Sequence, residues 1–158
     1  MGVGTQFTVY LPSSVEAQRE SNKRQSESPA VRGGTETILV VEDEALLREL
    51  VCSLLGGHGY KILEAESGVK ALNVWEAHRD KIDLVLTDLV MPDRLNGREL
   101  AEKLWAERPE LKVIFTSGYS ADVVGKDFVL RKGLRYLQKP YPPHKLAFIV
   151  RECLDVVN

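Results

Sequence analysis

The chain has 158 residues, of which 44% are hydrophobic and 28% charged, with a formal net charge of −2. This composition is typical of a globular protein with enough apolar mass for a core, and the length suits one ordinary domain with some excess. Acidic and basic residues are mixed along the chain without a basic stripe. That distribution argues against binding to nucleic acid or to a membrane surface.

The sequence shows neither a membrane span nor an export signal. No apolar run approaches the roughly 18 residues that a transmembrane helix requires, and no basic segment followed by an apolar one marks a secretory signal. Cys52 and Cys153 lie far apart and belong to no Cys/His cluster, which suits a reducing compartment better than a disulfide or zinc site. We therefore expect a cytoplasmic protein.

The first 36 residues differ in character from the rest. Within residues 1–12, Phe7, Val9 and Leu11 alternate with polar or mixed neighbours, which is typical of a single strand. One strand cannot fold alone, because its hydrogen bonds and its apolar face lack a partner. Residues 13–36 hold four acidic and four basic residues and hardly a large apolar one. Such a segment cannot offset its chain entropy, so we expect a flexible linker followed by a domain over 37–158.

From residue 37 onward, short β-branched apolar runs alternate with segments of helical periodicity. The pattern predicts five strands, over 37–42, 60–65, 82–88, 111–117 and 135–139. It also predicts five helices, of which the fourth covers 119–131 and the first carries an apolar face of Leu47, Leu50, Val51 and Leu54. This is the pattern of an α/β fold, (βα)5, with a doubly wound parallel five-stranded sheet covered on both faces. Periodicity alone does not give the order of the strands.

Chemically competent side chains follow four of the predicted strands. Glu42 and Asp43 follow the first strand, Asp88 ends the third, and Thr116 and Lys139 end the fourth and fifth. Each has an ordinary explanation when taken alone, as a helix cap, a turn residue or a solvated strand end. Ligands of open α/β sheets, however, bind outside the carboxyl ends of the strands. Three carboxylates, a hydroxyl and an ammonium are thus expected at one edge of the sheet.

This combination predicts phosphoryl transfer assisted by a metal ion. Carboxylates crowded together are costly unless they share a cation, and oxygen ligands without His or Cys favour Mg²⁺ with a position open for a phosphate. Lys139 and Thr116 could bind the remaining phosphoryl oxygens. Asp88 could then act as the nucleophile and become an acyl phosphate.

On these residues, the segment from about 36 to 158 resembles the receiver domain of two-component response regulators. Glu42 and Asp43 match the acidic pair of that family, Asp88 its phosphoacceptor, Thr116 its hydroxyl and Lys139 its lysine. The resemblance implies the flavodoxin-like strand order 2-1-3-4-5 and Mg²⁺ as cofactor. It also implies that the domain catalyses its own phosphorylation and dephosphorylation at the aspartate.

The resemblance assigns further roles. The main-chain carbonyl of Val90 would bind the metal, and Pro140 would follow a cis peptide bond. Tyr136 would rotate with the hydroxyl on activation and change the face formed by the fourth helix, fifth strand and fifth helix, although a half-buried strand aromatic is an equal explanation. Glu42 departs from the commoner Asp of the family. Because Val90 and Gly118 carry no side chain that could activate water, we expect slow self-dephosphorylation.

Two features resemble hybrid sensor kinases. The segment GVGTQFTVYLP within residues 1–12 resembles the last strand of a histidine-kinase ATPase domain, and Gly97 comes one residue later than in many receivers, as in receivers fused to kinases. The chain would then be a C-terminal piece without the ATP site. The implied donor is the phosphohistidine domain of a histidine kinase, and the implied acceptor is a histidine phosphotransfer domain.

Three alternatives remain beside this interpretation. A stand-alone receiver would act only by binding a partner when phosphorylated. A phosphatase of the haloacid dehalogenase type would need an acid two residues after its nucleophile, where this chain has Val90. A dinucleotide-binding domain would need GxGxxG after the first strand, where Glu42 and Asp43 stand. Since the chain ends soon after its last helix, we expect no direct control of transcription.

Overall fold

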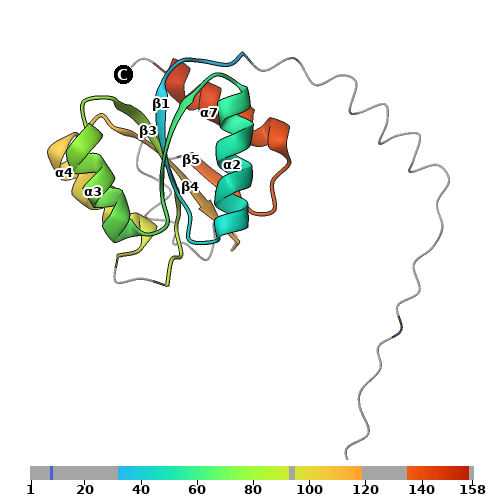
Figure 1. Cartoon of the computed structure of the whole chain (residues 1–158), viewed down its shortest axis with the longest axis horizontal. Helices are drawn as coiled ribbons and strands as arrows, with labels where there is room; N and C mark the ends of the chain where they lie inside the picture. The colour runs from blue at the N-terminus through green and yellow to red at the C-terminus, as the bar shows by residue number, and fades with distance from the viewer. Residues whose placement is uncertain (1–7, 9–31, 93–94, 119–134, 157–158) are drawn as a thin grey trace, which may run out of the picture. The chain divides into compact units, whose positions relative to one another are not determined.

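The computed structural model describes residues 8, 32–92, 95–118 and 135–156 (Figure 1). The chain divides into two units, residues 1–30 and 31–158, and all described residues except Thr8 belong to the second. The predicted helix over 119–131 lies outside the described residues. So do the predicted strand over 1–12, apart from Thr8, and most of the predicted linker.

A parallel five-stranded sheet forms the centre of the domain, in the order β2-β1-β3-β4-β5. Its strands are β1 (Thr37–Val41), β2 (Lys61–Ala65), β3 (Ile82–Asp88), β4 (Lys112–Ser117) and β5 (Arg135–Gln138). The five strands and their order confirm the predicted flavodoxin-like fold. The predicted bounds of the third strand are correct, and those of the other four are wrong by one residue at one end.

Four helices are described, and they lie on both faces of the sheet: α2 (Ala45–Gly57), α3 (Gly68–His78), α4 (Gly97–Glu107) and α7 (Pro143–Asp155). Figure 1 shows α2 and α7 on one face and α3 and α4 on the other. Side-chain N-caps mark the start of two of these helices. Ser67 accepts a hydrogen bond from the main-chain N–H of Lys70 before α3, and Asn96 forms a capping box with Glu99 at α4. Within the described part of the chain, no helix is both long and apolar enough to cross a membrane.

Each face of the sheet has its own apolar core, because successive side chains of a strand point to opposite faces. Leu39 and Val41 of β1 belong to the core under α3 and α4, together with the fully buried Trp75. Ile38 and Val40 belong to the core under α2 and α7. This double burial explains why β1 has a continuous apolar run rather than an alternating one.

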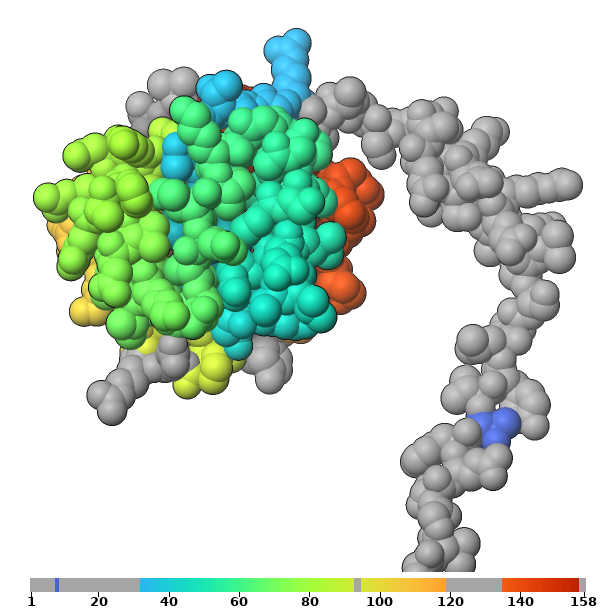
Figure 2. All heavy atoms as spheres, viewed as in Figure 1, coloured from blue at the N-terminus to red at the C-terminus, as the bar shows by residue number. Residues whose placement is uncertain are grey.

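The predicted core face of α2 is partly wrong. Val51 and Leu55 are the buried residues of the helix, whereas Leu50 is 60% exposed and Leu46 is 76% exposed. The apolar stripe of α2 is wider than its contact with the sheet, so leucines remain on the surface. In Figure 2, α2 and α3 cover the face turned toward the viewer.

The described domain begins before Thr37. The Gly34 N–H donates to the carbonyl of His58 at 3.1 Å, and Glu36 binds the Arg151 guanidinium of α7 at 2.8 Å. A Cβ atom at Gly34 would lie 2.6 Å from Arg151 Nη1 and 2.7 Å from the Tyr60 ring. The end of the predicted linker is therefore packed against α7, and a Cβ atom at position 34 would require the neighbouring side chains of Glu36, Tyr60 and Arg151 to shift.

Both cysteines are free thiols. Burial, reinforced by the charge of Glu64, raises the pKa of the half-buried Cys52 to about 11. Burial also raises the pKa of Cys153, which lies in the core under α7. Neither thiol has the depressed pKa that marks a reactive cysteine.

Candidate functional site

The strand register brings the predicted site residues to one edge of the sheet. Asp88 at the end of β3 is the register partner of Thr116 on β4, and Thr116 is in turn the partner of Leu137 on β5. Two main-chain hydrogen bonds of 2.8 Å, from Leu89 to Thr116 and from Lys139 to Ser117, extend this pairing beyond the strands. Glu42 and Asp43 follow β1 directly. The carboxyl ends of four strands thus build one site.

Three carboxylates form the acidic part of the site. One oxygen each of Glu42, Asp43 and Asp88 lies within 4.8 Å of the others, and among the described residues no second group of three such ligands is found. Glu42 and Asp88 are buried, at 4% and 8% exposure, while Asp43 faces solvent. Burial raises the pKa of Glu42, and the charges of Asp88 and Asp43 add to that rise, against the opposing effect of Lys139.

Lys139 is shared between two of these carboxylates. Its Nζ atom lies 2.7 Å from Glu42 Oε2 and 2.6 Å from Asp88 Oδ2. Burial alone would lower the pKa of Lys139, but the hydrogen bonds to Asp88 and Glu42 outweigh it and raise the pKa. The ammonium is therefore charged at neutral pH. Among the described residues, Lys139 is the cation that binds two of these three carboxylates, so this set carries an excess of negative charge.

The second oxygen of Asp88 is held by the following loop. The Val90 N–H donates to Asp88 Oδ1 at 3.0 Å, and the Val90 side chain is 55% exposed. The loop returns to the site at Gly97, where a Cβ atom would lie 2.0 Å from the main-chain oxygen of Asp88. Glycine is required at this position because the first residue of α4 packs directly on the backbone of the aspartate.

The remaining predicted residues surround Asp88 and Lys139. Thr116 is buried, and its hydroxyl oxygen lies 3.5 Å from the carbonyl of Thr87. Tyr136 is half-buried on β5 and packs against the core under α3 and α4. The peptide bond between Lys139 and Pro140 is cis. The structure thus places Glu42, Asp43, Asp88, Thr116 and Lys139 at one edge of the sheet, whereas Tyr136 pairs with Phe115 further back along β5.

Sequence reasoning missed Arg48 and Tyr141. Arg48 Nη1 donates to the main-chain oxygen of Glu42 at 2.7 Å. Tyr141 lies beside the site, and burial raises its pKa to about 12. Neither role could be read from sequence spacing, since Arg48 acts on a backbone atom and Tyr141 is placed by the turn after β5.

An apolar groove of about 560 Å³ adjoins the site between α2 and the start of α7. Its lining comes from α2, the residue after β4, the segment after β5 and the first turn of α7. The residues are Leu47, Leu50, Val51, Leu54, Gly118, Lys139, Pro140, Tyr141, Pro143 and Leu146. Lys139 belongs to both the groove and the acidic site. A molecule seated in the groove would therefore lie next to the carboxylates.

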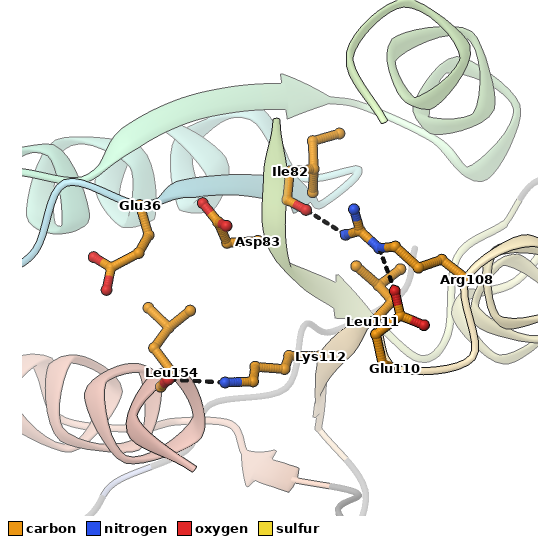
Figure 3. Close-up of a pocket in the computed structure, with 8 residues that line it drawn as sticks. All are labelled: Glu36, Ile82, Asp83, Arg108, Glu110, Leu111, Lys112 and Leu154. Carbon is orange, nitrogen blue, oxygen red and sulfur yellow. Dashed lines mark hydrogen bonds and ion pairs between the residues drawn. The ribbon is translucent and has the colours of Figure 1, made fainter. Parts of the chain in front are cut away.

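The amino ends of the strands hold a different pocket, of about 270 Å³ (Figure 3). Its two basic side chains bind main-chain carbonyls: Lys112 donates to Leu154 and Val156 at 2.8 Å each, and Arg108 donates to Ile82. These contacts satisfy carbonyls at the end of α7 and the start of β3. The acidic side chains of this pocket are also engaged within the fold: Glu36 with Arg151, Glu110 with Arg108 and Asp83 with the Thr37 N–H.

Comparison with known proteins agrees with the geometry of the acidic site. The response regulator receiver domain family matches residues 38–151. The chain belongs to this family. The two-component receiver predicted from the sequence is thereby confirmed, although the match does not test the roles of individual residues.

Known receivers are similar to the chain in sequence and in structure. The sensor kinase CckA of Brucella abortus is 33% identical over 98% of this chain, but the chain spans only 17% of that protein. The receiver protein CpdR of the same organism is 30% identical over 66% of this chain and 84% of its own length. The crystal structure of the receiver domain of the hybrid histidine kinase CckA has 34% identity and a TM-score of 0.65, covering 75% of this chain and 99% of that one.

Proposed function

We propose that this receiver accepts a phosphoryl group from phosphohistidine on the carboxylate of Asp88. The observation that carries the proposal is the Lys139 ammonium, 2.6 Å from Asp88 at the edge where Glu42 and Asp43 add two further carboxylates. Phosphoryl transfer depends mainly on positioning and on stabilisation of charge. This arrangement supplies both.

The transfer forms one bond and breaks another. An oxygen of Asp88 attacks the phosphorus atom, so that an acyl phosphate forms while the P–N bond to the donor imidazole breaks. The electron pair of that bond stays on the ring nitrogen. Lys139 would turn from the carboxylate to a phosphoryl oxygen, and the Thr116 hydroxyl would donate to another.

Mg²⁺ is part of this proposal because the donor set suits it. The three acidic ligands offer oxygen only, and Asp43 is open to solvent, as expected for a hard ion that keeps several waters. Glu42, Asp43, Asp88 and the carbonyl of Val90 would hold the ion. When bound, Mg²⁺ would offset the negative charge of the phosphoryl oxygens.

Thr116 and Tyr136 would report the phosphorylation state. The Thr116 hydroxyl oxygen lies 3.5 Å from the Thr87 carbonyl oxygen. A hydroxyl that turns toward the phosphoryl group vacates space next to β5, into which Tyr136 can move. The surface of β5, α7 and the predicted helix over 119–131 would then present a different face to partners.

We further propose that the chain is the C-terminal part of a hybrid sensor kinase. The similarity to the sensor kinase CckA extends over 98% of the chain, which includes residues outside the receiver match of 38–151. Residues 1–12 would be the last strand of the ATPase domain and residues 13–36 a tether. A histidine phosphotransfer domain would receive the phosphoryl group next, and the location would be cytoplasmic.

The donor would use the apolar groove beside Lys139. Any donor must bring its phosphohistidine to Asp88, and the groove shares Lys139 with the site. Leu50 and Leu46 add exposed apolar surface along α2. An amphipathic helix that carries the phosphohistidine could bury this surface while presenting its ring to Asp88.

Incubation with acetyl phosphate and Mg²⁺, followed by mass measurement, tests the proposed function. We expect the wild-type chain to gain the mass of one phosphoryl group and Asp88→Asn to gain none. Asp83→Asn is the matched control, because Asp83 lies on the same strand at its opposite end. A wild-type chain that gains no mass would reduce this domain to a binding module.

A further inference from the structure

We propose that Arg48 is a positioning residue for the acidic pair Glu42 and Asp43, an inference that rests on the proposed Mg²⁺ site. Arg48 lies in the first turn of α2 and donates through Nη1 to the main-chain oxygen of Glu42 at 2.7 Å. Its Nε atom lies 3.3 Å from Glu64 Oε2 on β2, and its side chain is only 14% exposed. The guanidinium is thus fixed between two elements.

The contact with Glu42 reaches the atoms that orient both acids. The oxygen that Arg48 binds belongs to the peptide unit joining Glu42 to Asp43. Because a peptide unit is planar, fixing its oxygen also fixes the direction of the Asp43 N–H and the Cα atoms on both sides. The two carboxylates extend from those Cα atoms. Arg48 therefore restrains the acidic pair without touching either carboxylate.

No side-chain cap restrains the same loop from its other end. Glu44 is the N-cap residue of α2, and its side chain makes no capping hydrogen bond. The loop is tied to the sheet by the main-chain bond from the Glu42 N–H to the Ala65 carbonyl at 3.1 Å. Arg48 adds a second tie to the neighbouring strand β2, through Glu64. Arg48 is thus one of two ties that hold the main chain of the acidic pair to β2.

Arg48 and Lys139 act on the acidic pair in different ways. Lys139 binds the Glu42 carboxylate itself at 2.7 Å, so a cation must compete with it. Arg48 binds the main-chain carbonyl of the same residue and does not occupy either carboxylate. Side chains that orient metal ligands in this way typically change metal affinity about 10- to 100-fold when they are removed.

Calorimetric titration of the full chain with MgCl2, in the absence of any phosphodonor, tests the inference. We expect Arg48→Gln to weaken Mg²⁺ binding about tenfold and Arg48→Lys, which can still donate to the carbonyl, to recover part of the loss. Lys70→Gln is the matched control, because it removes one positive charge from an exposed ion pair and Lys70 lines the same surface pocket as Arg48. The control should bind Mg²⁺ like wild type.

The rate of phosphorylation by acetyl phosphate distinguishes an effect of Arg48 on the orientation of the acidic pair from an effect on the stability of the fold. For Arg48→Gln we expect the Mg²⁺ concentration at half-maximal rate to rise with the dissociation constant, while the rate at saturating Mg²⁺ stays near wild type. An unchanged dissociation constant with a lowered melting temperature would overturn the inference, since Arg48 would then only tie α2 to β2.

A second variant covers the case in which Arg48→Gln does not fold. Glu64→Ala frees the guanidinium from β2 and should weaken Mg²⁺ binding in the same direction, by a smaller factor. Mg²⁺ binding equal to wild type in Glu64→Ala would overturn the role of the Arg48–Glu64 pair. A wild-type chain without Mg²⁺ affinity would overturn the proposed function and this inference with it.

Discussion

At the carboxyl ends of the strands, Lys139 binds the carboxylates of Glu42 and Asp88, whereas at the amino ends Lys112 binds two main-chain carbonyls of the last helix and the residue after it. Both are lysines beside the same sheet. Lys112 completes the hydrogen bonding of a helix end, so its charge is used within the fold. Lys139 balances only part of the negative charge of the carboxylates beside it, and under the proposed function a cation would balance the rest. We infer from this difference that a lysine bound by main-chain carbonyls serves the fold, whereas a lysine held between acidic side chains indicates a ligand site.

The two lysines offer the largest expected contrast. Lys139→Gln should slow phosphorylation by acetyl phosphate about hundredfold, because it removes a preorganised charge from the reacting oxygens. Lys112→Gln should leave that rate unchanged and lower the free energy of unfolding by about 1 kcal/mol. Mass spectrometry of the phosphorylated chain and urea unfolding measure the two effects. Equal rates in the two variants would break the comparison.

The groove beside Lys139 predicts a smaller effect that depends on the donor. Leu50→Glu places a charge in the apolar groove and should slow transfer from a phosphohistidine-bearing kinase domain about tenfold, as for a moderately important interface residue. The rate with acetyl phosphate, which needs no docking surface, should not change. Val69 is another exposed apolar position, on α3 outside the groove, and Val69→Glu should behave like wild type with both donors. A loss with acetyl phosphate would mean that Leu50→Glu damages the site itself.

The lifetime of the acyl phosphate should respond to position 90. Val90 is exposed next to Asp88 and offers no group that could orient water. We therefore expect slow hydrolysis of the acyl phosphate in the wild-type chain and severalfold faster hydrolysis in Val90→Asn. The loss of phosphoryl mass over time measures both rates. Val69→Asn serves as the control for surface polarity. Rapid decay of the wild-type phosphate would show that another group activates water.

The smallest expected effects concern pH, and they have opposite signs at the two ends of the sheet. The hydrogen bond from Arg151 holds the pKa of Glu36 below its usual value of 4.5. Glu36 therefore contributes stability above that value, which is lost as pH falls through the lowered pKa. Burial raises the pKa of Glu42 above 4.5, so its contribution is present below that value and is lost as pH rises through the raised pKa.

Urea unfolding without Mg²⁺, repeated from acid to neutral pH, separates these contributions. Glu36→Gln should make the free energy of unfolding depend less on pH at acidic pH. Glu42→Gln should flatten it between the usual carboxyl pKa and neutrality. If both variants altered the free energy of unfolding over the same pH range, the two ends of the sheet would not differ in the way that their charges indicate.

Much of the fold could be predicted because its signals are local. β-branched runs and helical periodicity predicted every described helix and strand. Because Glu42, Asp88, Thr116 and Lys139 each stand at the end of a predicted strand, the sequence also predicted that they lie at one edge of the sheet. The strand order came from the resemblance to receivers, since periodicity carries no information on which strands are neighbours. Leu50 was misplaced because periodicity does not distinguish a core face from the wall of a groove.

Features that depend on backbone atoms could not be predicted. The role of Gly97 follows from the approach of a Cβ atom to the Asp88 oxygen, and that of Arg48 from a bond to the Glu42 oxygen. Neither contact leaves a pattern in side-chain type. The packing of Gly34 against Arg151 is a third example, because the polar composition of residues 13–36 indicated a linker throughout.

The raised pKa values of the two native thiols have a practical consequence for fluorescence labelling. A pKa of about 11 for Cys52 leaves it roughly a hundredfold less thiolate at neutral pH than an ordinary cysteine, and thiolate is the form that reacts with maleimides. Among the described residues, none has an atom within 4 Å of a Cβ atom built at Gly118. Gly118→Cys would therefore accept a dye selectively, in a chain that keeps its own cysteines, at the wall of the groove where a donor is expected to arrive.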